Sequence, residues 1–131
     1  MKTNAIDNFL CTDLWTSEIN GGNDGLIAIE FGPDPVSGLF TGSHVLPTFE
    51  IRGVNGKCTH PGPGQSDHVF EFYETARSGE RYYYSGVVVP DASAAHRHRI
   101  PNGKRRRLFF NLEENRKEML DDDEWVGTHT T

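Results

Sequence analysis

The sequence predicts a single all-β domain over residues 1–131, folded as an eight-stranded antiparallel up-and-down β-barrel. Two observations predict this fold. Short runs rich in β-branched and aromatic residues recur between Gly, Pro, Asn and Asp, whereas helical periodicity is almost absent. Most consecutive runs are joined by short turns, which favours a meander of neighbouring strands. A meander of this size can close into a barrel, which removes its open edges.

The first four expected strands are each bounded by residues that break regular structure. The run LCTDLWTSEI ends at the glycine-rich segment NGGNDG, which is typical of a turn between strands. GLIAIEF and GLFTGSHVL flank a turn that contains proline, and TFEIRGV follows directly after Pro47. We expect these strands at residues 10–19, 25–31, 38–46 and 48–54.

The second half of the chain alternates similar runs with two longer loops. HVFEFYET, RYYYSGVVV, RRLFFNL and EWVGTHT are expected as strands at residues 68–75, 81–89, 106–112 and 124–130. The segments 55–67 and 90–105 are rich in glycine, proline and polar residues, so we expect loops there. One or two helical turns are expected within LEENRKEML, where Glu113 and Lys117 have the i, i+4 spacing of a helical ion pair.

The hairpin over residues 68–89 indicates which side chains face the interior. If RSG is a three-residue loop with Gly79 in the left-handed conformation, Ala76 pairs with Glu80 and Phe72 lies opposite Tyr84. One face then carries Phe70, Phe72, Tyr82, Tyr84 and Val88. A two- or four-residue loop would move the tyrosines to the other face. We favour the three-residue loop because it gives one coherent aromatic face.

Alternation along a strand assigns an inward set to the other strands as well. In the strand expected at 48–54, Phe49 and Ile51 face inward and Glu50 and Arg52 outward. The remaining inward sets are Trp15, Ser17 and Ile19; Phe40, His44 and Leu46; Leu108, Phe110 and Leu112; and Trp125, Gly127 and His129.

This expected interior is more aromatic and more polar than a packing core. A packing core prefers aliphatic residues, because buried polar groups without partners are costly. An aromatic lining with a few polar groups is typical of a small-molecule site. The predicted ligand-binding residues are Trp15, Ser17, His44, Phe70, Phe72, Tyr82, Tyr84, Phe110, Trp125 and His129. The alternative is that the tyrosines and histidines lie near the barrel ends and hydrogen-bond to loops or water.

Several short motifs occur in an order that resembles a known family. Trp15 opens the first strand, and GLFTGSHV is similar to a Gly-x-x-Thr-Gly pattern on a third strand. YYYSGVVV is similar to a Trp-Ser-Gly sixth strand, and WVGTHTT to a terminal Val-Gly-x-Asp-x-Phe-Thr strand. The chain thus resembles the avidin and streptavidin family of barrels, within the calycin group that includes lipocalins. The resemblance implies a ligand-binding barrel that forms homo-oligomers, with outward Tyr73, Tyr83 and Val87 at a subunit interface.

The positions that bind biotin in this family carry other residues here. Tyr84 stands where the family has a tryptophan, and Tyr82 where it has a ligand-binding hydroxyl. His44 replaces a tyrosine and His129 an aspartate that hydrogen-bond the ureido group. A carboxylate only accepts hydrogen bonds, whereas a neutral imidazole has one donor and one acceptor. We therefore predict no tight binding of biotin.

Charge and cysteine content limit the class of partner and the compartment. The formal net charge of −6 disfavours nucleic acid as the main partner, although KRRR forms one basic run at 104–107. Neither a signal peptide nor a membrane span is visible, so we expect a cytoplasmic protein that does not bind membranes. In that compartment Cys11 and Cys58 are expected to be free thiols.

No motif for a metal or cofactor stands out, and we predict none. His96 and His98 are two residues apart in HRHR, but no third ligand has a matching position, so a transition-metal site there is disfavoured.

Three functions remain open from the sequence. The first is a module that binds a small, largely apolar or aromatic molecule in the barrel. The second is an isomerase or cyclase in which His44, His129 or Tyr84 acts as a general acid or base. The third is an oligomeric interaction protein. Binding is favoured over catalysis because no nucleophile–base pair is recognisable.

Overall fold

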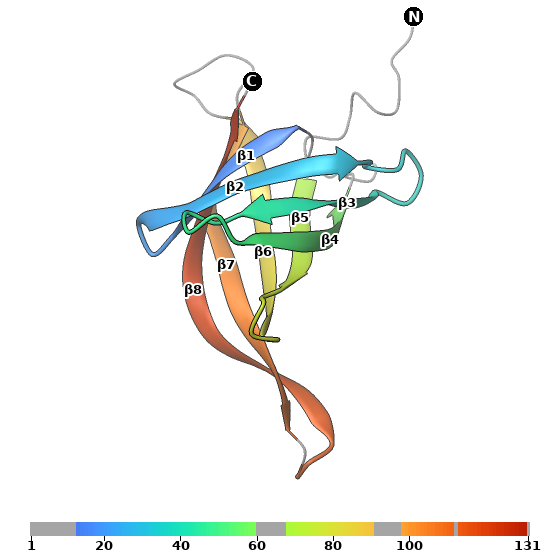
Figure 1. Cartoon of the computed structure of the whole chain (residues 1–131). Helices are drawn as coiled ribbons and strands as arrows, with labels where there is room; N and C mark the ends of the chain where they lie inside the picture. Colours follow the sequence, from blue (N-terminus) through green and yellow to red (C-terminus); the bar gives the residue numbers. More distant parts are fainter. Residues whose placement is uncertain (1–12, 60–67, 91–97, 112, 131) are drawn as a thin grey trace, which may run out of the picture.

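The computed structural model describes residues 13–59, 68–90, 98–111 and 113–130, which form a closed antiparallel barrel (Figure 1). Each strand pairs with the next, and β8 pairs with β1 to close the barrel. The expected all-β, eight-stranded up-and-down architecture is confirmed. The strands are β1 (Leu14–Ile19), β2 (Gly22–Phe31), β3 (Leu39–Val45), β4 (Ile51–Thr59), β5 (His68–Thr75), β6 (Arg81–Pro90), β7 (His98–Asn111) and β8 (Arg116–Thr130).

The hairpin between β5 and β6 has the expected three-residue loop. The Ala76 N–H donates to the Glu80 carbonyl at 2.7 Å, and Gly79 has a φ of +96°. Phe72 lies directly opposite Tyr84, and their rings stack 4.5 Å apart. The register with one aromatic face is therefore confirmed, and that face points into the barrel.

The centre of the barrel is a packed aromatic core. The Phe70 ring meets Trp15 edge-to-face at 5.1 Å and Trp125 at 5.8 Å, an arrangement that aromatic quadrupoles favour. The buried hydrophobic cluster consists of Trp15, Ile27, Phe40, Val54, Cys58, Phe70, Phe72, Tyr84, Val88, Ile100 and Trp125. Most of the aromatic residues expected inside are therefore buried against one another.

The inward set expected for strand 48–54 is wrong. The Leu46 N–H donates to the Glu50 carbonyl, and Phe49 has a φ of +70°, so residues 47–49 form a hairpin turn. Phe49 is 84% exposed and Ile51 is 67% exposed. Alternation alone does not show where a strand begins, and a shift of one residue exchanges the two faces. The inward side chains of β4 are instead Arg52, Val54 and Cys58.

The helix expected within residues 112–120 is also absent from the described chain. Residues 113–115 form a turn, and β8 begins at Arg116. β7 begins at His98, inside the segment expected as a loop. Glu113 and Lys117, whose spacing suggested a helix, instead lie in the turn of the long β7–β8 hairpin and at the start of β8. The described part of the chain contains no helix long and apolar enough to cross a membrane.

The distal halves of β7 and β8 form a two-stranded arm. Figure 1 shows both strands continuing past the ends of their neighbours. Cross-strand ion pairs join the basic run of β7 to the acidic run of β8, with Arg105 2.7 Å from Asp123 and Arg106 2.8 Å from Asp122. The KRRR segment is thus largely neutralised within the chain.

Cys58 is fully buried and disulfide-bonded, so the expected free thiol is wrong. Cys11, the other cysteine of the sequence, lies outside the described residues. The two positions are far apart in sequence and carry no spacing motif, so the sequence offers no direct signal for a bridge.

Gly25→Ala is expected to destabilise the barrel by about 2 kcal/mol or more. Gly25 has a φ of +87°, and an added Cβ would lie 2.0 Å from the Val45 carbonyl oxygen, which is a severe steric clash. Gly53→Ala is the control, because nothing lies within 4 Å of its added Cβ and its φ is ordinary. Urea denaturation of both variants measures the difference; equal stabilities would contradict the left-handed backbone conformation assigned to Gly25 in β2.

Candidate functional site

His44 is a fully buried histidine of β3 held between two carboxylate-bearing residues. Its Nδ1 lies 2.6 Å from Glu74 Oε1 on β5, and its Nε2 lies 2.5 Å from the Asp24 carbonyl oxygen on β2. Asp24 Oδ2 is also 3.4 Å from Nε2. A carbonyl and an ionised carboxylate only accept hydrogen bonds. Both ring nitrogens of His44 are therefore suited to donate, which is the protonation state of an imidazolium.

The surroundings of His44 favour that charged form. Burial by itself lowers the pKa of His44, but the hydrogen bond to Glu74 and the negative charges of Glu74 and Asp24 outweigh it. The pKa of His44 is therefore raised above its ordinary value of 6.5. The ring is best described as one member of a buried ion-pair network.

Asp24 connects this histidine to the aromatic core. The Ser17 hydroxyl donates to Asp24 Oδ2 at 2.8 Å, and the Tyr84 hydroxyl donates to the same oxygen at 3.0 Å. Trp125 Nε1–H in turn donates to the Ser17 hydroxyl at 2.9 Å. One buried carboxylate thus fixes the polar ends of three side chains that were predicted to bind a ligand.

Two arginines supply the remaining hydrogen-bond donors of this network. Arg52 Nη1 donates to Glu74 Oε2 at 2.6 Å, and Arg105 hydrogen-bonds both Asp123 and the Tyr84 hydroxyl. Both guanidinium groups lie over the half-buried ring of Tyr82, at 5.4 and 4.9 Å from its centroid. Every polar side chain of this group that the structure describes has a partner within the chain.

His129, near the other end of β8, is placed very differently. Its residue exposure is 7%, yet neither ring nitrogen has a hydrogen-bond partner among the residues that the structure describes. Asp13 Oδ2 lies 3.5 Å from Nε2, beyond good hydrogen-bond geometry, and the Asp13 side chain is 73% exposed. The Trp15 and His98 rings lie 5.2 and 6.3 Å from the His129 ring. A buried imidazole without hydrogen bonds therefore lies between a core tryptophan and the barrel end.

The predicted ligand-binding residues fall into two groups in the structure. Ser17, His44, Tyr84 and Trp125 belong to the Asp24 network, with Phe72 stacked on Tyr84 and Tyr82 half-buried under the arginines. Trp15 and His129 lie toward the other end, with Phe70 at the centre between the groups. The side chain of Phe110 lies outside the described part of the structure. Whether these residues bind a ligand stays a prediction.

Several residues of the network were not among the predicted site residues, including Arg52, which was expected to face outward. Glu74 follows Phe70 and Phe72 at the same alternation on β5, so strand parity contained a signal for it. Asp24 was assigned to a turn, and Arg105 to a basic run expected to be solvated. Neither of these two had a sequence signal that distinguished it from surface charges.

The described histidines do not form a metal centre. His98 is half-buried with its ring 6.3 Å from that of His129, while His96 lies outside the described residues. Among described residues, no group of three or more His, Cys, Asp or Glu side chains has a geometry suited to a metal ion.

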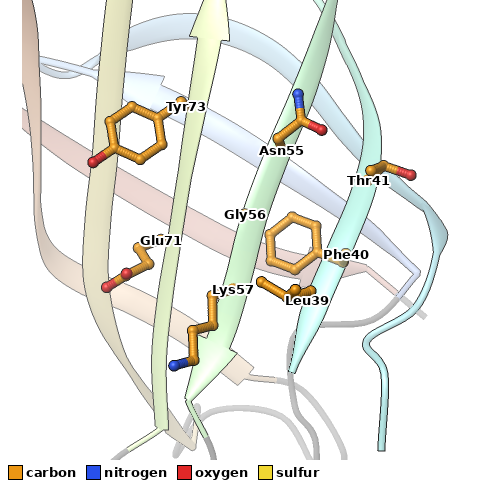
Figure 2. Close-up of a pocket in the computed structure, with 8 residues that line it drawn as sticks. All are labelled: Leu39, Phe40, Thr41, Asn55, Gly56, Lys57, Glu71 and Tyr73. Atoms are coloured by element: carbon orange, nitrogen blue, oxygen red, sulfur yellow. The ribbon is translucent and has the colours of Figure 1, made fainter. Parts of the chain in front are cut away.

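A groove on the outside of the barrel is a separate feature (Figure 2). It has a volume of about 430 Å³ and crosses β3, β4 and β5. Gly56 leaves room for the Phe40 ring beside it, because an added Cβ would come within 2.5 Å of that ring. Tyr73, 40% exposed, borders the groove and packs its ring 4.8 Å from that of Tyr83. The groove lining consists of Leu39, Phe40, Thr41, Asn55, Gly56, Lys57, Glu71 and Tyr73.

No family model, no curated protein and no solved structure matches the chain. The closed eight-stranded antiparallel barrel is compatible with a calycin-like fold. A relation to the avidins stays a prediction.

His44→Phe is expected to lower the free energy of unfolding by about 3 kcal/mol near pH 6, because it leaves buried carboxylates without their cation. In the wild type, the folded state binds the His44 proton more tightly than the unfolded chain. This contribution is therefore complete below pH 6.5 and is lost as the pH rises through the raised pKa.

Denaturation curves of both proteins at several pH values between about 6 and 9 test this expectation. The stability difference between them should shrink as the pH increases. His129→Phe serves as a control that removes a histidine outside the network. Parallel pH profiles for wild type and His44→Phe would refute the imidazolium assignment.

Proposed function

We propose that the barrel binds a small, largely apolar or aromatic molecule in its interior, at the end that contains His129. The observation that carries this proposal is the buried His129 ring, whose two nitrogens have no hydrogen-bond partner in the described part of the chain. An unsatisfied buried polar group costs about 1–3 kcal/mol, and proteins retain such groups mainly where a ligand or water completes them.

The neighbours of His129 suggest the chemistry of the ligand. Trp15 supplies a flat apolar surface next to the histidine. The exposed side chain of Asp13 lies near Nε2, so this side of the ring is close to solvent. Burial, together with the nearby charge of His129, lowers the pKa of His98 below its ordinary value of 6.5, which favours its neutral form at pH 7. A neutral imidazole offers one donor and one acceptor. The site suits an aromatic or heterocyclic molecule with a polar edge.

The Asp24 network is a weaker candidate for ligand binding. A ligand would have to replace hydrogen bonds that Ser17, His44 and Tyr84 already make within the chain. The same network supports the prediction that biotin does not bind tightly, because Asp24 and His44 occupy each other's hydrogen-bonding groups. That prediction is still to be tested.

The isomerase or cyclase alternative has less support than binding. Burial, with the nearby charges of Glu74 and Asp24, raises the pKa of Tyr84 above its ordinary value of 10, so its phenolate is inaccessible as a base near neutral pH. Both ring nitrogens of His44 are already engaged by internal acceptors. Among the predicted catalytic residues, His129 alone has ring nitrogens without a described hydrogen-bond partner.

The disulfide at Cys58 bears on the cellular compartment in which the protein would bind this ligand. Disulfides persist in oxidising compartments and are rare in the cytosol. We propose a location of that kind in place of the cytoplasmic one expected from the sequence. Free-thiol titration of protein purified under native conditions tests this, since reduced Cys58 would favour the cytoplasm.

Native mass spectrometry of the purified protein should detect a retained small molecule or identify one from a set of heteroaromatic compounds. For that compound, His129→Phe is expected to weaken affinity roughly tenfold, because the ring remains and both nitrogens are lost. Quenching of tryptophan fluorescence measures the affinity, with Trp15 beside the site.

Tyr84→Phe is the matched control for that titration. It removes one hydroxyl from the Asp24 network and should lower stability with little change in affinity. Unchanged affinity in His129→Phe combined with a loss in Tyr84→Phe would place the site in the Asp24 network.

A further inference from the structure

Two histidines lie side by side at the barrel end where the ligand is proposed to bind. Arg99 of β7 pairs with Thr128 of β8, and the residues next to them in the two strands are His98 and His129. The rings of these two histidines are 6.3 Å apart. His98 has the same alternation as the fully buried Ile100, so it faces the interior, as the buried His129 does.

The titratable side chains that the structure describes at this end are mainly imidazoles. His68 begins β5 at the same end and has the alternation of the buried Phe70, so it adds a third imidazole. Asp13 is the carboxylate that lies near His129, and its side chain is 73% exposed. The last residues of β6 carry no charge, and Arg99 alternates to the outer face. Basic groups therefore predominate around the two histidines.

The opposite end of the barrel shows what these histidines lack. There, His44 has Glu74 Oε1 2.6 Å from its Nδ1 and the Asp24 carbonyl oxygen beside its Nε2. Neither nitrogen of His129 has such an acceptor among the described residues. Burial and the charge of His129 both lower the pKa of His98, and no acid of the chain offsets them. An acceptor with a negative charge is thus the group that would complete this end.

We propose that the ligand is an aromatic carboxylic acid whose carboxylate accepts hydrogen bonds from His98 and His129 and whose ring packs against Trp15. This inference rests on the proposed function and names the class of its ligand. A carboxylate has two acceptor oxygens, so one group can bond both rings. The Trp15 ring, 5.2 Å from that of His129, offers an aromatic surface to the rest of the molecule. A negative charge favours protonated imidazoles, so binding takes up protons.

Calorimetric titration with naphthoate and the matching naphthamide tests this class, because the two probes share a ring system and differ in charge. Near pH 6 the wild type is expected to bind naphthoate roughly tenfold more tightly than naphthamide, since charge-assisted hydrogen bonds are the stronger ones. The dissociation constant of naphthoate should rise about tenfold between about pH 6 and 8, as the imidazoles lose their protons. That of naphthamide should change little.

Substitutions separate the charge of the site from its shape. His98→Phe should weaken naphthoate binding roughly tenfold near pH 6 and change naphthamide binding by less than about twofold, because a ring remains and a donor is lost. Asp13→Asn removes a negative charge near His129 and should strengthen naphthoate binding about threefold. Glu18→Gln is the matched control: it removes an exposed carboxylate near the other end of β1 and should affect neither probe.

Three outcomes would overturn the inference. Equal affinity of the wild type for the two probes near pH 6 would do so, and the proposed function would stand with a neutral ligand. Naphthoate binding that His98→Phe and His129→Phe both leave unchanged would place the acid elsewhere. Binding of neither probe at millimolar concentration would also exclude an aromatic acid. The proposed function fails as well only if native mass spectrometry finds no bound neutral compound, so the two failures are distinguishable.

Discussion

The buried imidazole of His44, with an acceptor at each ring nitrogen, is the constraint that organises this interior. An uncompensated buried charge is strongly unfavourable, so the ring requires acceptors on both sides, and Glu74 and Asp24 provide them. Glu74 then requires a partner for its second oxygen, which Arg52 supplies from β4. The inward position of Arg52 places its neighbour Ile51 on the outer surface. One ion pair thus accounts for the face that a whole strand turns to the core.

The same network orients the aromatic core. Asp24 accepts from Ser17 and Tyr84, and Ser17 accepts from Trp125, so hydrogen bonds fix the directions of the indole and phenol rings within the core. Phe72 stacks on Tyr84, and Phe70 packs edge-to-face between the tryptophans. Polar groups that are fully paired in a low-dielectric interior specify a unique arrangement. His129 departs from this rule among the described residues, and the proposed function rests on that departure.

The fold and much of the interior could be predicted from the sequence, whereas the partners of the polar groups could not. Strand parity placed Trp15, Phe72 and Tyr84 inside, because alternation is a local property of each strand. It failed at Phe49 because a non-glycine residue in the left-handed conformation leaves no clear turn signal. It also missed Asp24 and Glu74. Sequence patterns predict that a charged residue is exposed unless its partner is known. For Asp24 and Glu74 the partners lie on other strands, so the local sequence does not reveal them.

β8 belongs both to the barrel and to the arm that extends beyond it. Its residues 125–130 belong to the barrel and place His129 at one end, while its residues 116–122 lie in the arm beyond the other end. Between them, Trp125 is anchored to Ser17, and Glu124 is capped by Asn20. These fixed points separate the arm from the half of β8 that carries His129. Substitutions in the arm and at His129 are therefore expected to change stability independently, because additivity holds for distant sites that share no partners.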